Sequence, residues 1–113
     1  KNVIKITASL PESGEQVVSP RFAFYARKKA VRLEEAEGEV STEMLMAYPP
    51  GIPIICPGER ITREIIDYAK ALQAEGCHLQ GTEDPEGLEI KVIADKEALE
   101  MQYFRFQQAE RVG

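Results

Sequence analysis

The residues best suited to chemistry lie in one short segment, YPPGIPIICPGERIT, which runs from Tyr48 to Thr62. Four prolines and two glycines enclose the apolar run from Ile52 to Cys56, and a carboxylate, Glu59, follows at its exit. Proline fixes φ and disfavours helix in the residue before it, so this backbone is stiff. A carboxylate on a stiff turn suits a cationic ligand, because little conformational entropy is lost on binding. The alternative is that Glu59 only caps a turn or forms a salt bridge where the next helix begins.

Other candidates for catalysis or metal binding are few. Cys56 and Cys77 form no CxxC pair, and the single histidine, His78, cannot complete a zinc site with them. The chain holds no GxSxG, HExxH, Walker A or GxGxxG pattern. The acidic residues 83–86 lack the alternation of an EF-hand loop. We therefore predict no catalytic residue and no metal ligand in this chain, two buried free thiols, and a structural or solvent-facing His78.

Composition indicates one globular domain with no nucleic-acid or membrane partner. The chain has 113 residues, of which 43% are apolar and 29% charged, and its net charge is -5. Phosphate binding needs clustered Lys and Arg, and the one basic run, 27–29, is expected to complement a helix end. No segment reaches the roughly 20 apolar residues of a membrane span, and no signal peptide is visible, so we expect a cytoplasmic protein. Because the chain begins with Lys1 and not Met, we expect it to be a piece of something longer.

Three helices are expected from capping residues and periodicity. Ser19 and Pro20 are typical of a helix start, and the pattern continues into the basic run. Thr62 is a good N-cap for a second helix, with Gly76 at the position after its end. Residues 95–113 are expected to form a terminal helix that begins at Asp95.

Four short strands are expected from β-branched and alternating apolar residues, at 3–7, 31–34, 52–56 and 88–93. Residues 41–47 are ambiguous between a helical turn and irregular backbone, and 78–87 read as a polar, glycine-rich loop. Helices separate successive strands in two places, so part of the sheet is expected to be parallel. The prediction is an α+β fold, with residues 1–113 as a single small domain that has a short mixed sheet and about three helices.

The segment Tyr48 to Thr62, followed by a helix and the G-x₄-G segment from Gly76 to Gly81, resembles the C-terminal part of the Orn/Lys/Arg decarboxylase family. A YPPGIP…PGE signature is typical of that region, and the upstream VRLEEAEGEVSTEML is similar too. The match covers roughly Val18 to Ile93. The resemblance implies a pyridoxal-phosphate (PLP) enzyme of the aspartate-aminotransferase fold type, a carbon–carbon lyase of polyamine biosynthesis that decarboxylates arginine, lysine or ornithine.

The resemblance also implies which residues meet the substrate. In the family, the glutamate of the PGE corner faces the distal cationic group of the substrate, and here that residue is Glu59. Such a carboxylate, in a partly dry cleft, makes a charge-assisted hydrogen bond and discriminates against neutral amino acids. Tyr48 and Cys56 are expected to flank the same corner, Tyr48 as a second substrate-binding residue and Cys56 for packing.

The chain departs from the family where the cofactor chemistry is concerned. The Schiff-base lysine typically follows a histidine, whereas His78 is followed by Leu79, and the phosphate cradle is also missing. We therefore expect the C-terminal domain of a longer enzyme, which forms one wall of the substrate cleft, binds no cofactor and is inactive alone. Its expected partners are the N-terminal PLP-binding domain of the same protein, the basic amino acid, and further copies in a homo-oligomer.

A second function stays open. The same fold could serve as a stand-alone, non-catalytic binding module, in which the aromatic stripe of Leu99, Tyr103 and Phe106 acts as a docking helix. The coding sequence upstream of Lys1 distinguishes the two, because only the enzyme requires a Schiff-base lysine there.

Overall fold

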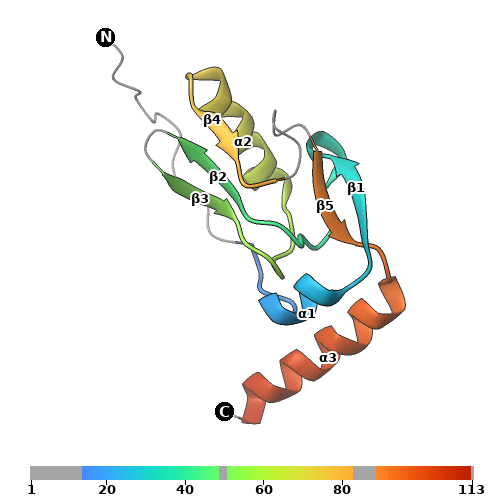
Figure 1. The fold of residues 1–113 in the computed structure, drawn as a ribbon. Helices are drawn as coiled ribbons and strands as arrows, with labels where there is room; N and C mark the ends of the chain where they lie inside the picture. Colours follow the sequence, from blue (N-terminus) through green and yellow to red (C-terminus); the bar gives the residue numbers. More distant parts are fainter. Residues whose placement is uncertain (1–13, 49–50, 83–88, 113) are drawn as a thin grey trace.

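The computed structural model describes residues 14–48, 51–82 and 89–112. In chain order the elements are α1 (Pro20–Tyr25), β1 (Lys28–Arg32), the 3₁₀ helix η1 (Leu33–Glu35), β2 (Leu45–Tyr48), β3 (Ile52–Ile55), α2 (Arg63–Ala74), β4 (His78–Gln80), β5 (Glu89–Ile93) and α3 (Lys96–Val112) (Figure 1). Three α-helices and two small sheets confirm the α+β class. None of the described helices is long and apolar enough to cross a membrane.

The strands form two separate sheets and not one mixed sheet. β1 pairs with β5, and β2 lies between β3 and β4 in a three-stranded sheet. Every ladder among the described strands is antiparallel, so the expected parallel pairing is wrong. The reason is that each intervening segment returns the chain in the opposite direction: a hairpin joins β2 to β3, and α2 brings β4 back against the other edge of β2.

The first helix is shorter than its periodicity predicts. It ends at Tyr25, and the basic run enters β1, which pairs residue by residue with β5 from Lys28↔Ile93 to Arg32↔Glu89. The Lys28 ammonium nevertheless donates to the carbonyls of Phe24 and Ala26 at the end of α1. The basic side chain therefore complements the helix end as expected, but does so from a strand, because pairing with β5 overrides the local helical pattern.

Two more segments differ from their expected states. Part of the ambiguous stretch 41–47 lies in β2, and part of the expected loop 78–87 is β4, a three-residue edge strand with Leu79 buried. Both strands become identifiable only through their shared ladder, in which Met46 faces Gln80 and Tyr48 faces His78. The expected strand at 3–7 and the acidic residues 83–86 lie outside the described residues.

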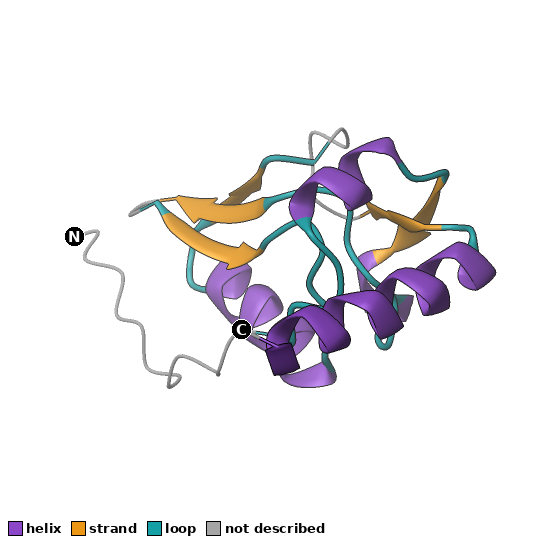
Figure 2. Cartoon of the chain, turned by 90° about the horizontal axis from the view of Figure 1, so that it is seen from below, coloured by secondary structure: helices purple, strands orange, loops and turns teal. Residues whose placement is uncertain are grey.

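Two hydrophobic clusters hold the elements together. The larger cluster joins the apolar face of α2 to both sheets, and its α2 members are Ile65, Ile66, Tyr68, Ala69 and Leu72. Thr62 caps α2 by accepting from the Ile65 amide at 3.1 Å, as predicted. The smaller cluster joins α1 and α3 through Ala23, Ile93 and Leu99. As a result α3 lies at one end of the molecule next to α1, away from α2 (Figure 1, Figure 2).

Residues 58–61 form the middle of an irregular three-segment ribbon. They bridge antiparallel to residues 15–18 on one side and to residues 38–41 on the other. Gly58 bonds to both flanking segments, because its carbonyl accepts from the amides of Val17 at 2.9 Å and Val18 at 3.3 Å, while its amide donates to the Ser41 carbonyl at 2.8 Å. Its φ of +90° lies in the left-handed region that glycine tolerates.

Replacement of Gly58 by alanine tests this crossing. A Cβ on Gly58 would lie 2.3 Å from the Val18 carbonyl oxygen, whereas Gly38 has the similar φ of +87° with nothing within 4 Å. We expect Gly38→Ala to cost about 1–2 kcal/mol from backbone strain alone, and Gly58→Ala to cost at least about 2 kcal/mol more. Urea unfolding of the two variants measures the difference. Equal losses of stability in the two variants would show that glycine is needed at position 58 for its positive φ and not for the close contact with Val18.

Candidate functional site

Glu59 closes the turn that carries it. Its amide donates to the Cys56 carbonyl at 3.1 Å, and its carboxylate oxygen Oε1 accepts from the Cys56 amide at 3.1 Å. The turn-capping alternative raised by the sequence is therefore part of what Glu59 does. A carboxylate has two oxygens and about four acceptor positions, so one bond to Oε1 leaves capacity at Oε2. The half-buried side chain is thus held in one orientation while it can still accept from a ligand.

Gln16 holds the same corner through its side-chain amide, a role that no feature of the sequence predicts. Its Nε2 donates to the Val18 carbonyl at 2.6 Å and to the Pro57 carbonyl at 3.2 Å. Gln16 also bridges Glu59 through the backbone ribbon. The Pro57 contact joins residues 41 positions apart, and a glutamine in a polar loop carries no local pattern that predicts such a partner.

Arg60 links the corner to α3. Its Nη1 donates to the Gly38 carbonyl at 2.9 Å, and its guanidinium lies 5.8 Å from the centre of the Tyr103 ring. The Tyr103 hydroxyl donates a hydrogen bond to Glu15 Oε2 at 2.7 Å. The Arg60 amide also donates a hydrogen bond to the backbone carbonyl of Glu15. Two flanking segments therefore fix the residue beside Glu59, which stiffens the corner beyond what its prolines and glycines provide.

The structure does not bring Tyr48 to this corner. In the β2–β3 ladder Ala47 faces Ile52 and Leu45 faces Ile55, so Tyr48, the last residue of β2, lies at one end of the hairpin and Cys56 follows its other end. At about 3.3 Å per residue, the two ends are separated by roughly 10 Å or more. Tyr48 is 37% exposed and its hydroxyl lies 3.7 Å from Met46 Sδ. The expectation that Tyr48 and Cys56 flank one corner is wrong, because the extended hairpin separates residues that the sequence places close together.

The two thiols differ in exposure. Cys77 is buried as predicted, whereas Cys56 is half-buried beside Glu59. Burial, and secondarily the Glu59 carboxylate, raise the pKa of the Cys56 thiol. His78, in β4, is exposed as expected. Within the ranges that the structure describes, no three His, Cys, Asp or Glu side chains gather in a group that could hold a metal ion.

Alkylation of Cys56 reports on the Glu59 carboxylate. In a Cys77→Ser background, Glu59→Gln keeps an Oε1 acceptor for the Cys56 amide and removes the negative charge. We expect the pKa of Cys56 to fall and its reaction with iodoacetamide to be faster near pH 8, because more thiolate is present. Rates measured across pH check this.

The matched control for this experiment is Glu75→Gln. It removes a carboxylate that acts on Cys77 instead, so it should leave the Cys56 rate unchanged. An unchanged rate in Glu59→Gln would contradict the placement of the carboxylate beside the thiol.

Sequence comparison identifies relatives with this same region. Residues 6–108 match the model of the Orn/Lys/Arg decarboxylase C-terminal domain. An arginine decarboxylase of Bacillus subtilis (strain 168) is 43% identical over 91 residues, which are 80% of this chain and 19% of the relative. The constitutive lysine decarboxylase of Escherichia coli K12 is 34% identical over 76 residues, or 61% of this chain and 11% of that protein. The chain thus spans less than a fifth of the length of these relatives.

Solved structures agree with the sequence comparison. The structure of the E. coli constitutive lysine decarboxylase matches with a TM-score of 0.63 and 26% identity, over 74% of this chain and 14% of the other. The lysine decarboxylase of Francisella novicida matches with a TM-score of 0.60 and 34% identity, over 71% and 13%. The family match covers all described helices and strands except the last residues of α3. The chain belongs to the Orn/Lys/Arg decarboxylase C-terminal domain family.

Proposed function

We propose that this chain is the C-terminal domain of a longer PLP-dependent decarboxylase of arginine, lysine or ornithine, and that it forms one wall of the substrate cleft. The family match over residues 6–108 carries the proposal. Relatives that bear the names arginine decarboxylase and lysine decarboxylase support a basic amino acid as the substrate class. The resemblance further supports a cytoplasmic enzyme of polyamine biosynthesis that assembles as a homo-oligomer.

In this proposal Glu59 binds the distal cation of the substrate. The Cys56 amide, the Gly58 crossing and Gln16 fix the position of the carboxylate before a ligand arrives, so little ordering entropy opposes binding. An ammonium or a guanidinium would donate to the oxygen that the Cys56 amide does not use. A carboxylate accepts from either cation, so Glu59 selects for a basic side chain and leaves the choice among the three amino acids to other contacts.

Four lysines in the described part of the chain do not fit a PLP site. Lys28 donates to the end of α1, Lys29 and Lys96 pair with Glu39, and Lys70 pairs with Glu34 at 3.1 Å. These four ammonium groups lie on the exposed surface, where water would compete with a Schiff base. We therefore assign cofactor binding to the N-terminal part of the longer protein and derive no catalytic step through PLP from these residues.

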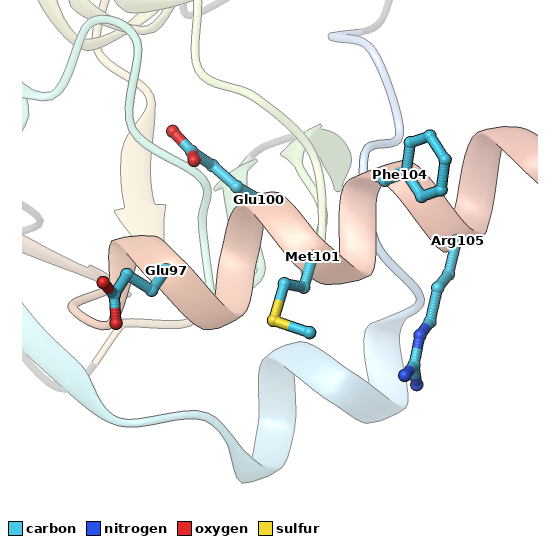
Figure 3. A pocket seen from close by; sticks show the side chains of 5 residues that line it. All are labelled: Glu97, Glu100, Met101, Phe104 and Arg105. Carbon is cyan, nitrogen blue, oxygen red and sulfur yellow. The ribbon is translucent and has the colours of Figure 1, made fainter.

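The stand-alone binding module remains the second candidate, but its docking helix must be redefined. Leu99 is 7% exposed, and Tyr103 packs against the cluster that joins α3 to the domain. These two residues of the predicted stripe are therefore used within the chain, and the expectation that they form a docking face is wrong. The large apolar side chains that α3 exposes, among the residues whose burial is described, are Met101 and Phe104 instead (Figure 3).

Glu59→Gln in the full-length enzyme tests the proposed site. The substitution keeps the acceptor for Cys56 and removes only the charge, so folding should be retained. We expect KM for the basic substrate to rise about 10- to 100-fold, the range of a lost charge-assisted hydrogen bond. Steady-state decarboxylation of arginine, lysine and ornithine measures the effect.

Two further variants separate the binding and structural roles of Glu59. Glu35→Gln removes an exposed carboxylate on η1 and should leave KM unchanged. Glu59→Ala also removes the turn cap and should lower stability by about 1 kcal/mol, whereas Glu59→Gln should not. If Glu59→Gln matches the parent enzyme in KM while Glu59→Ala is destabilised, Glu59 is a turn cap only and the substrate-binding proposal fails.

A further inference from the structure

Gln16 lies directly opposite Glu59 in the ribbon that carries the candidate site. Two backbone hydrogen bonds, of 2.8 Å and 2.9 Å, join the residues on either side of this pair, from the amide of residue 60 to the carbonyl of residue 15 and from the amide of residue 17 to the carbonyl of residue 58. This is the pattern of a non-hydrogen-bonded pair in an antiparallel ladder, in which the two Cα atoms lie about 4.5 Å apart and the side chains are closest. The side chains of Gln16 and Glu59 therefore share one face of the ribbon.

The side-chain amide of Gln16 has a fixed orientation. Its Nε2 donates to the carbonyls of Val18 at 2.6 Å and Pro57 at 3.2 Å, which uses both of its protons. The reversed orientation would place Oε1 against these two carbonyl oxygens, which are acceptors like itself. The amide also packs against Gly58, where a Cβ would lie 2.4 Å from Nε2. Within the part of the chain that the structure describes, Oε1 of Gln16 accepts no hydrogen bond, so its acceptor positions are available.

The Glu59 carboxylate has a matching arrangement. Its Oε1 accepts from the Cys56 amide at 3.1 Å, which leaves capacity at Oε2. The half-buried pair of Gln16 and Glu59 thus offers an amide oxygen and a carboxylate oxygen on one face, and each side chain is oriented by its own bond to the turn at residues 56–59. We propose that Gln16 Oε1 is a second acceptor for the distal cation of the substrate, and that it favours a guanidinium over an ammonium. This inference rests on the proposed function, because it adds a residue to the site assigned there to Glu59.

A guanidinium and an ammonium use two such oxygens differently. A guanidinium holds five N–H donors in a rigid plane and commonly binds a carboxylate through two parallel hydrogen bonds. Because the Cys56 amide already bonds Oε1 of Glu59, the second bond of that fork needs another acceptor, and Gln16 Oε1 supplies it. An ammonium is a compact, strongly hydrated donor group that can turn toward Oε2 of Glu59 and keep water on its other protons. Loss of Gln16 Oε1 should therefore weaken binding of a guanidinium more than binding of an ammonium.

Replacement of Gln16 by methionine in the full-length enzyme tests this selectivity. Gln16→Met keeps the length of the side chain and removes both the donor and the acceptor. We expect kcat/KM for arginine to fall about 10-fold or more, and kcat/KM for lysine to fall less than about 3-fold. The ratio of the two values is informative, because a displaced Glu59 carboxylate would penalise both cations alike. Gln73→Met, at an exposed position of α2, is the matched control and should leave both values unchanged.

A second variant, Gln16→Glu, separates the acceptor of Gln16 from its donor. Both Gln16→Glu and Gln16→Met lack the Nε2 group that bonds the Val18 and Pro57 carbonyls, but only Gln16→Glu keeps side-chain oxygens. If the oxygen binds the guanidinium, Gln16→Glu should retain several-fold more activity on arginine than Gln16→Met. If Gln16 only orients the corner, the two variants should lose activity equally, which would contradict the proposal. Thermal unfolding measures whether each variant folds.

Failure of this inference and failure of the proposed function give different results. If the parent enzyme decarboxylates no basic amino acid, or if Glu59→Gln leaves KM unchanged, the proposed function or its site fails and the role of Gln16 fails with it. If Glu59→Gln raises KM but the ratio of arginine to lysine activity is the same in the parent enzyme and in Gln16→Met, Glu59 binds the cation without Gln16. A parent enzyme whose kcat/KM is higher for lysine than for arginine would also overturn the inference, and this comparison needs no variant.

Discussion

Gly58 lies where three segments of the chain cross within hydrogen-bonding distance, and the rest of the candidate site depends on that crossing. The amides of Val17 and Val18 converge on its carbonyl from one side, and its own amide reaches Ser41 on the other. A side chain at this position would overlap the Val18 carbonyl, so the contact requires a residue without Cβ. The same ribbon continues to β5 through the bridge between Ser41 and Val92, which joins the corner to the second sheet.

This crossing explains why Glu59 occupies a defined position. Its side chain bonds the Cys56 amide at the start of the turn, and Arg60 is held by Gly38 and by the Tyr103 ring. The carboxylate is therefore oriented by the protein and not by a ligand. Preorganisation of this kind suits a binding site whose other wall comes from protein outside this chain.

The third helix has two sides, one packed on the domain and one exposed, that its periodicity alone does not separate. Leu99 and Tyr103 attach the helix to the domain. Met101, two positions after Leu99, and Phe104, one position after Tyr103, point to solvent. Every apolar residue of an amphipathic helix contributes to the same sequence pattern, whichever surface it contacts. Only the placement of α1 and β5 beside α3 decides which residues become core and which are exposed.

The sequence by itself determined the local features: the Thr62 and Asp95 caps, the glycine after α2, the strand ending at Ile93, the turn that leads to Glu59 and the family signature around Glu59. These follow from propensity, capping and turn chemistry over a few residues. Tertiary structure alone decided the antiparallel sheets, the early end of α1 at Tyr25, the strand at His78–Gln80, the separation of Tyr48 from Glu59 and the role of Gln16. Each of these depends on a partner far along the chain, and a hydrogen bond between distant residues leaves no periodic trace in the sequence that forms it.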